Sequence, residues 1–524
     1  MSELNVDICA STDRQTTEGT ARCWAPVRKV VLSLSLALAC QSALAQATYR
    51  IKPLGVLGGC TASAPAAAAL NDAGEVVGSA CNANGDTHAF VWKNDGAPMV
   101  DLGPDKVGAV SYATDINASG LVAVSGGISA GDGTPLRKIP GLLCRCLNYF
   151  NPSSINDLGQ LTGSVWLTLA PYRELHAFLW NGGSRAFDLG TLGGHISSGR
   201  SINASGQVAG MSYLLGSAAF HAFIWKNDGT PMLDLGTLGG ENSSAGAINA
   251  SGQVAGQSNT LQATQTHAFI WRNDGTRMQD LGTLGGVESY FSALNNSGQV
   301  TGYSYTHGLQ NAHAFAWMND GTPMKNLGTF GGTISYANGI NSSGQVTGSA
   351  SLAGDTISHA FLWRHDGTKI QDLNKLVDPA DPIKSYITLT SGDFINDRGD
   401  VLANGTDSRT GLSGPYLLQG AELTLSPRSL AFGSLPINTT SAAKSVTMTN
   451  TSANVVAIVS VALTGSAAGQ FASTNNCGSS LVGHATCTIK VTFKPNAKGA
   501  KSATLNVNGG GGGLRSVGLT GTGT

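Results

Sequence analysis

A repeat of about 46 residues runs from residue 49 to residue 420 and limits the fold more than any other feature. The tripeptide His-Ala-Phe, with Trp two residues after the Phe, occurs six times, and the last four intervals are 45, 46, 46 and 46 residues. An aliphatic residue followed by a turn-forming Asn occurs eight times, so we count eight units. The first marker contributes His88, His176, His221, His267, His313 and His359, together with Trp92, Trp180, Trp225, Trp271, Trp317 and Trp363. The second contributes Asn71, Asn117, Asn156, Asn203, Asn249, Asn295, Asn341 and Asn396.

Each unit reads as four short strands joined by tight turns. In the unit around Asn249, we expect strands over residues 243–248, 253–257, 267–271 and 278–281. Asn and Gly stand between these segments in the order that tight turns need. Four short strands in about 46 residues is the size of a β-propeller blade. Helical repeats are disfavoured because each unit carries several glycines.

The two ends of the array complement each other. The last unit has no fourth strand, whereas residues 49–54 resemble a fourth strand with no unit before it. Pairing these segments closes the ring and removes two exposed sheet edges. The sequence therefore predicts an all-β fold with a seven- or eight-bladed propeller, seven if the irregular second unit forms no blade. The propeller is expected over residues 46–420, before a second domain at 421–524.

The repeat resembles a known family. The segments at 188–194, 234–240 and 280–286 read Asp-Leu-Gly-Thr-Leu-Gly-Gly, and they combine with the Asn turn and His-Ala-Phe. This pattern is similar to the HAF repeat of bacterial extracellular repeat proteins. The resemblance implies export and a propeller-like array, and it brings no catalytic residues.

The last hundred residues have a different strand spacing. Seven alternating segments between residues 423 and 520 favour an immunoglobulin-like sandwich. The stretches 425–433, 477–478 and 487–495 resemble the Hydin-like domains of choice-of-anchor D proteins. That resemblance implies a spacer or adhesion module.

The first 45 residues are read as an N-terminal extension and signal peptide. Arg28 and Lys29 precede an apolar run at 30–40, and a small-residue pattern predicts cleavage after Ala45. The true start could lie near Val27. Because no other apolar stretch is long enough to span a bilayer, we expect no stable membrane insertion after cleavage. The expected location is the periplasm, the cell surface or the extracellular space.

The charge balance excludes two classes of partner. Only 12% of residues are charged, and 31 basic residues stand against 32 acidic ones. A nucleic acid or an anionic membrane would need a basic patch that this composition cannot supply. An unidentified protein or glycan is the expected partner.

Six cysteines follow the cleavage site, and an even number in an exported chain predicts disulfides. In regular units, nine residues separate the Gly-Gly pair from the turn Asn, but the first unit has twelve. The longer spacing lets the first cysteine lie opposite the second across the hairpin. The predicted pairs are Cys60 with Cys81 and Cys477 with Cys487, and the state of Cys144 and Cys146 stays open.

The six histidines are interpreted as structural, because one active site cannot use copies spread around a ring. A ring N–H can bond a neighbouring carboxylate, and the Asp of Asp-Leu-Gly in the same unit is the predicted partner. The sequence predicts no catalytic residue, no cofactor and no metal site.

The irregular stretch 142–150, with Leu143, Tyr149 and Phe150, is the candidate contact surface, because insertions in propellers usually emerge on one face. The function we expect is a non-enzymatic scaffold or binding protein that takes a protein or glycan through blade loops or the central channel. The alternative is a secreted carbohydrate-active hydrolase or lyase. Acidic and aromatic side chains converging at one channel mouth would favour the enzyme, and a lining of Gly, Ser and Ala would favour the scaffold.

Overall fold

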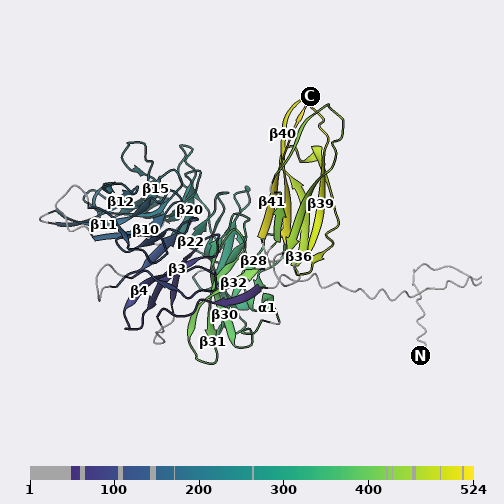
Figure 1. Ribbon diagram of the computed structural model, residues 1–524. Helices are drawn as coiled ribbons and strands as arrows, with labels where there is room; N and C mark the ends of the chain where they lie inside the picture. The colour runs from purple at the N-terminus through teal and green to yellow at the C-terminus, as the bar shows by residue number, and fades with distance from the viewer. Residues whose placement is uncertain are drawn as a thin grey trace, which may run out of the picture. The chain divides into compact units, whose positions relative to one another are not determined.

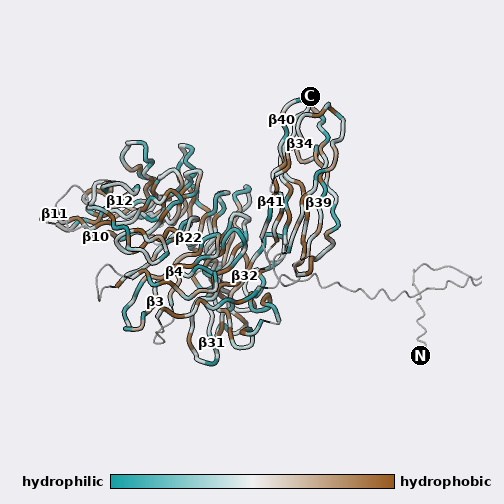
Figure 2. The backbone as a smooth tube through the Cα atoms, viewed as in Figure 1, coloured by the Kyte–Doolittle hydropathy of each residue, from teal (hydrophilic) through white to brown (hydrophobic). Residues whose placement is uncertain are grey.

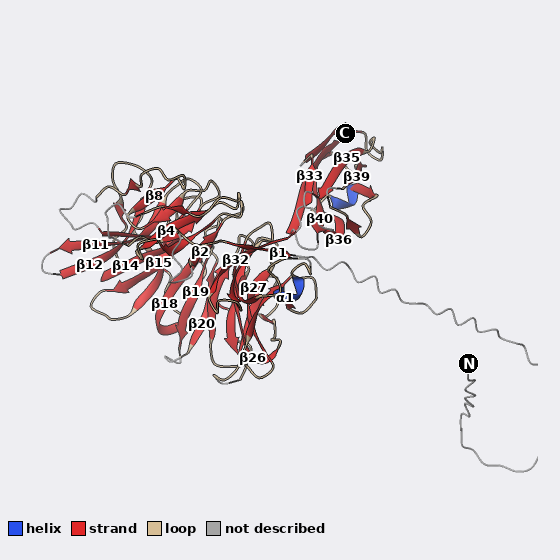
Figure 3. Ribbon diagram, turned by 60° about the horizontal axis from the view of Figure 1, so that its bottom comes forward, coloured by secondary structure: helices blue, strands red, loops and turns tan. Residues whose placement is uncertain are grey.

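Strands are the main secondary structure in the part of the chain that the computed structural model describes (Figure 3). The described residues are 49–58, 65–103, 110–141, 149–169, 172–261, 265–307, 309–379, 381–420, 423–427, 429–450, 456–483, 485–509 and 513–524. Within them, the helical elements are one short α-helix, α1 (Leu373–Leu376), and one 3-10 turn, η1 (Ala468–Gln470). The expected all-β class is confirmed.

Each of the first four repeat units forms four antiparallel strands, ordered along the sheet as in the sequence. The strands are β2 (Ala66–Leu70), β3 (Val76–Cys81), β4 (Thr87–Trp92) and β5 (Val100–Asp101); β6 (Ala113–Ile116), β7 (Val122–Val124), β8 (Gly127–Ser129) and β9 (Arg137–Lys138); β10 (Tyr149–Ile155), β11 (Leu161–Leu169), β12 (Tyr172–Trp180) and β13 (Phe187–Asp188); and β14 (Gly193–Ile202), β15 (Val208–Leu214), β16 (Phe220–Trp225) and β17 (Leu233–Asp234). The irregular second unit therefore has its own sheet of short strands. A parallel bridge between Leu175 and Ile196 links the third and fourth sets.

The next three units repeat this arrangement. Their strands are β18 (Gly239–Ile248), β19 (Val254–Thr260), β20 (Thr266–Trp271) and β21 (Gln279–Asp280); β22 (Ser289–Leu294), β23 (Val300–Tyr305), β24 (Ala312–Trp317) and β25 (Lys325–Asn326); and β26 (Gly331–Ile340), β27 (Val346–Leu352), β28 (Ser358–Trp363) and β29 (Gln371–Asp372).

The last unit takes its fourth strand from the other end of the array. It contributes β30 (Ile387–Ile395), β31 (Val401–Asp407) and β32 (Ser413–Gly420), and the outer place is filled by β1 (Tyr49–Pro53). The β1–β32 register runs from Tyr49 opposite Gly420 to Pro53 opposite Tyr416. Figure 1 shows β1 in purple against the green of β32. The predicted pairing of the two ends is thus observed.

The hydrophobic core of the repeat region lies between consecutive sheets. The Ala and Phe of His-Ala-Phe are fully buried in every unit that has them. In one cluster, Ala222 and Ile224 of β16 meet Phe269 and Trp271 of β20, one unit further on. Both faces of a sheet are therefore covered, and the brown colour that follows the strands in Figure 2 shows the same apolar content.

A β-bulge and a glycine shape the inner edge of these sheets. In the fifth unit the register shifts between Ala245 and Ala247, and equivalent shifts occur in the first strand of every unit. At Gly256 of β19 a Cβ atom would collide with the backbone carbonyl of Ser244. A side chain cannot fit where the bulge brings the two strands this close, so the position requires glycine.

The C-terminal segment forms two sheets around its own core. One sheet has β33 (Leu423–Ser426), β35 (Lys444–Asn450), β39 (Thr486–Phe493) and β37 (Phe471–Asn475). The other has β34 (Ser429–Leu435), β41 (Gly513–Gly523), β40 (Gly499–Gly509), β36 (Val456–Thr464) and β38 (Ser480–Leu481). The sequence predicts seven strands here, and β37 and β38 are the two that it misses. Both are short and rich in Ser, Thr and Asn, so they carry little apolar alternation.

Candidate functional site: the mouth of the asparagine ring

The turn asparagines of the repeat are buried and fully hydrogen-bonded. Asn249 is 4% exposed, and its Oδ1 accepts hydrogen bonds from the backbone N–H of Ser251 at 3.1 Å and of Gln253 at 3.0 Å. Gly252 completes the turn with a φ of +76°. An Asn side chain that satisfies the backbone two and four residues ahead fixes the hairpin.

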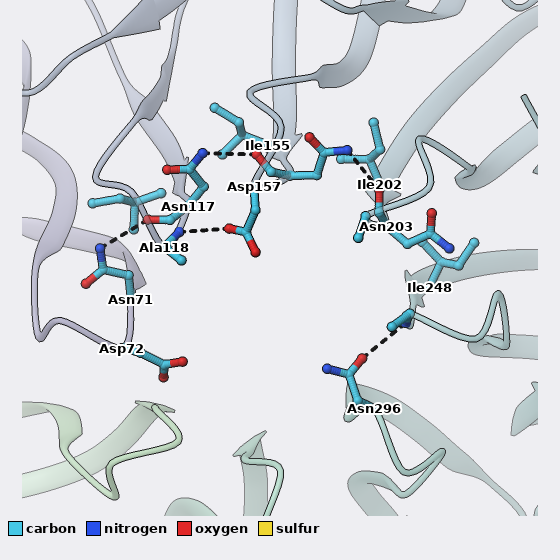
Figure 4. Close-up of a pocket in the computed structure, with 14 residues that line it drawn as sticks. Asn71, Asp72, Asn117, Ala118, Ile155, Asp157, Ile202, Asn203, Ile248 and Asn296 are labelled. Atoms are coloured by element: carbon cyan, nitrogen blue, oxygen red, sulfur yellow. Dashed lines mark hydrogen bonds between the residues drawn. The ribbon is translucent and has the colours of Figure 1, made fainter. Parts of the chain in front are cut away.

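Each turn asparagine also bonds the next unit. The Nδ2 of Asn249 donates to the backbone carbonyl of Asn295 at 3.2 Å, and the same contact recurs from Asn71 to Asn396. Asn396 then donates to the carbonyl of Asn71 at 3.1 Å, across 325 residues of sequence. The chain of hydrogen bonds therefore returns to its starting point. We call these eight residues the asparagine ring; Figure 4 shows part of it.

The ring explains the Asn-Ala-Ser triplets that match the glycosylation pattern. Asn117, Asn203 and Asn249 are buried, and their side-chain nitrogens already donate to the next turn. Turn formation therefore accounts for these triplets.

A pocket of about 350 Å³ opens at the ring. It is lined by Asn71, Asp72, Ile116, Asn117, Ala118, Ile155, Asn156, Asp157, Ile202, Asn203, Ala204, Ile248, Ala250 and Asn296. The four isoleucines of the lining each precede a ring asparagine, and the residues that follow the ring asparagines differ from unit to unit. Aromatic side chains do not occur in this lining.

Residues that follow ring asparagines form a second set of contacts between neighbouring turns. Asp157 accepts the backbone N–H of Ala118 at 3.0 Å, and Asn296 accepts that of Ala250 at 3.1 Å (Figure 4). In the last unit, Asp397 accepts the N–H of Ser342 at 2.8 Å, and its own N–H donates to Asp72 at 2.8 Å. The acidic groups are thus tied to neighbouring turns.

Carboxylates lie at the mouth, and the Arg398 side chain donates a hydrogen bond to the backbone carbonyl of Asp72 at 3.4 Å, where its charge favours the ionised carboxylate. Burial raises the pKa of Asp72 above its usual range, a backbone hydrogen bond from Asp397 opposes this, and the charges of Asp397 and Asp157 add to the rise. Burial also raises the pKa of Asp115 in β6 to about 6, although it accepts hydrogen bonds from the backbone of Ile155 and Ile116. The mouth itself offers hydrogen-bond acceptors, and Asp115 is not among the residues that line it. The sequence does not single out Asp72 or Asp157, although the variable position after each turn Asn could have pointed to them.

The predicted hydrogen bond from the histidine to an Asp of the same unit occurs in five units, and in the sixth unit Asn326 takes the place of the Asp. The Nδ1 of His267 donates to Asp280 at 2.9 Å, and this bond raises the pKa of His267. The equivalent pairs, at 2.8 to 3.0 Å, are His88 with Asp101, His176 with Asp188, His221 with Asp234, His313 with Asn326 and His359 with Asp372. Within the described ranges, no group of three or more His, Cys, Asp or Glu is placed to hold a metal ion.

The cysteine predictions have separate outcomes. Cys477 and Cys487 form the expected disulfide in the C-terminal segment. Cys81 is disulfide-bonded, and its predicted partner Cys60 lies outside the described residues. Cys144 and Cys146 lie outside them as well.

The candidate contact surface needs a correction. Tyr149 is 62% exposed, but Phe150 is 4% exposed and packs edge-on against Phe178 at 5.0 Å between ring centroids. Strand alternation turns Phe150 inward, so it belongs to the core and not to a contact surface. Leu143 lies outside the described residues.

Comparison with known proteins supports the C-terminal prediction. The family model "Abnormal spindle-like microcephaly-assoc'd, ASPM-SPD-2-Hydin" (ASH) matches residues 421–517, as expected for a Hydin-like domain. No curated protein sequence matches the chain.

Several solved structures are similar in fold. A puromycin-hydrolyzing peptidase of Mycobacterium tuberculosis is 11% identical over 74% of this chain and 64% of its own, with a TM-score of 0.38. The β-propeller domain of the Trilobed protease from Pyrococcus furiosus is 12% identical over 62% and 99%, with a TM-score of 0.36. A PapD-like ASH domain of human CEP192 is 13% identical over 20% and 86%, with a TM-score of 0.16. Likenesses this distant carry no inference about activity.

None of the helices among the described residues has the length and apolar character needed to cross a membrane.

Proposed function

We propose that this chain is an exported scaffold or binding protein without catalytic activity, built as an eight-bladed β-propeller followed by an ASH domain. The blade count is supported by the eight four-stranded sets in the described residues and by the return of the asparagine ring from Asn396 to Asn71. The strand β1 supplies the fourth strand of the last blade by pairing with β32.

The observation that carries the binding role is the mouth of the asparagine ring. It is an open pocket that presents Ala, Asn and Asp side chains, and the carboxylates of Asp72, Asp157 and Asp397 accept hydrogen bonds from neighbouring backbone. Such groups are held in place and can accept further bonds from hydroxyl or amide donors of a ligand. A hydrolase or lyase is not favoured, and the ASH domain suits a binding or scaffold role.

Export is supported by the sequence of residues 1–45 and by disulfides. The Cys477–Cys487 bond and the bonded state of Cys81 fit an oxidising compartment. The proposed location is the periplasm, the cell surface or the extracellular space. N-terminal sequencing of the protein recovered from its host cells tests this, and a protein that retains residues 1–45 would contradict it.

The binding role is tested by mixing the full chain with cellulose, chitin, peptidoglycan and solubilised cell-surface proteins. Co-sedimentation or cross-linking measures binding, and mass spectrometry of the soluble fraction detects products. The proposal expects at least one bound ligand that is recovered chemically unchanged. Steady release of soluble sugars would show the alternative enzyme and overturn the proposal.

A double substitution tests whether the ligand binds at the mouth of the asparagine ring. Asp72→Asn with Asp157→Asn removes two charges from the mouth, and a ligand held there should bind about tenfold more weakly. Asp274→Asn is the matched control, because Asp274 lies in an exposed turn where Oδ1 bonds the backbone of Thr276 at 3.0 Å. Equal affinity in both variants would contradict a role for the mouth.

A further inference from the structure

A cluster of tyrosines joins the sixth and seventh units through the strands β22, β23 and β26. Tyr290 of β22 and Tyr303 of β23 stack with their ring centroids 4.9 Å apart and an interplanar angle of 17°. Tyr336 of β26 meets Tyr303 edge-on at 4.9 Å, and Tyr305 meets it edge-on at 6.5 Å. The Tyr290 hydroxyl donates to the Glu288 carboxylate at 2.9 Å. We call these five residues the tyrosine cluster.

The repeat itself shows that the fold does not need these tyrosines. In the fifth unit, the positions equivalent to Tyr290, Tyr303, Tyr305 and Glu288 are occupied by Ser244, Gln257, Asn259 and Asn242. That unit forms the same four-stranded sheet with the same register and bulge. Aromatic rings at these positions are therefore an addition to the scaffold.

The added rings are partly exposed. Tyr336 is 37% exposed, and the other members of the cluster are half-buried. Elsewhere the chain covers aromatic faces with its own cations, as Lys226 does over Trp271 and Arg272 over Trp317. In the described residues, none of the Lys or Arg contacts of this kind involves the cluster. Part of the surface of the cluster is therefore exposed to solvent.

We propose that the tyrosine cluster is a binding site for a neutral oligosaccharide, with the sugar rings lying against Tyr290 and Tyr336. The inference rests on the proposed binding function and adds to it a ligand class and a second surface, distinct from the mouth of the asparagine ring.

The chemistry of the cluster matches both the apolar face and the hydroxyl groups of a sugar. The C–H groups on one face of a pyranose are weakly positive and pack against the negative face of an aromatic ring. The equatorial hydroxyls of the same sugar need acceptors and donors at the rim, which the Glu288 carboxylate and the tyrosine hydroxyls supply. Burial and the bond to Glu288 raise the pKa of Tyr290, so its hydroxyl stays protonated. The low overall charge of the chain agrees with a neutral ligand.

The test replaces the cluster by residues that the repeat already tolerates. Tyr290→Ser with Tyr303→Gln, the residues of the fifth unit, should fold, and Tyr336→Ser removes the exposed ring alone. Tyr213→Asn is the control, because Tyr213 is an aromatic residue of the fourth unit that pairs with Phe220 at 5.5 Å, away from the cluster. Circular dichroism and thermal melting confirm folding before binding is measured.

Cellohexaose, chitohexaose, xylohexaose and maltohexaose are titrated into the full chain by calorimetry. We expect at least one to bind, with affinity reduced tenfold or more in both tyrosine variants and unchanged in Tyr213→Asn. If all variants bind equally, or only the Asp72→Asn, Asp157→Asn protein loses binding, the inference is overturned and the proposed function stands. If none of the four binds, or tetramethylammonium binds at the cluster in their place, the inference is also overturned. The proposed function then depends on a protein ligand, and the cross-linking experiment decides it.

Discussion

Replacing one ring asparagine tests the closure of the repeat array directly. Asn249→Ala removes the acceptor for the backbone N–H of Ser251 and Gln253 and the donor to the backbone carbonyl of Asn295 and to the side-chain oxygen of Gln253. The Asn249 side chain is buried, and each of the three lost bonds to the backbone costs about 1 kcal/mol. We expect the free energy of unfolding to fall by about 3 kcal/mol. Urea denaturation followed by tryptophan fluorescence measures the change, because Trp271 of the same unit is buried.

Two further variants separate the contributions. Asn249→Asp keeps the acceptor for the two N–H groups but places an oxygen against the Asn295 carbonyl. The new carboxyl group can donate only when it is protonated, so the folded state raises its pKa. The destabilisation relative to wild type should therefore grow as the pH rises through that pKa and shrink at pH 5. Asn259→Ala is the control, because its side chain is half-buried and bonds the Thr266 hydroxyl.

The reasoning would be refuted if Asn249→Ala unfolded within about 0.5 kcal/mol of wild type, the scatter of ordinary surface substitutions. It would also fail if Asn259→Ala cost as much, because the loss would then reflect any missing amide and not the ring. An Asn249→Asp protein with the same stability at pH 5 and pH 8 would show that the donor to the next unit contributes nothing.

Three other perturbations follow from the same structure. His267→Ala should lower the free energy of unfolding by up to about 1 kcal/mol, the usual worth of a partly exposed ion pair. The folded state raises the pKa of His267, so the stability that this pair contributes is complete below about pH 6.5 and is lost as the pH rises. Thermal melts of Asp280→Asn should lack this pH dependence. A melting temperature that varies with pH in the same way in wild type and Asp280→Asn would contradict the pairing. Cys487→Ser opens a loop of 10 residues and should destabilise the C-terminal domain by about 2 to 3 kcal/mol, which limited proteolysis of the full chain with and without reductant can detect. Gly256→Ala should cost about 1 to 3 kcal/mol through the collision with the Ser244 carbonyl, and an unchanged urea midpoint would count against that contact.

The local sequence pattern alone was enough to predict the strands and the contact between the histidine and its partner inside one unit. The His267 and Asp280 positions lie 13 residues apart in one hairpin, so recognising the strands already brings the two side chains together. The Asn-x-x-Gly turns could be predicted in the same way. The position of residues 49–53 as the fourth strand of the last unit followed from counting strands, because that unit has only three of its own. The period of the apolar residues and the turn residues are short-range properties of the sequence. Because the unit occurs eight times, its strand pattern can be recognised even where single units depart from it.

Contacts between units were decided only by the tertiary structure. The bond from Asn396 to Asn71 spans 325 residues, and the tyrosine cluster joins Tyr303 to Tyr336 of the next sheet. Whether such groups meet depends on the angle between packed sheets, which is set by side-chain volumes across the whole interface and not by any one segment. The inward position of Phe150 is a different case: its contact with Phe178 lies within one unit and follows from the alternation of β10, which the sequence interpretation of residues 142–150 as a surface overlooked.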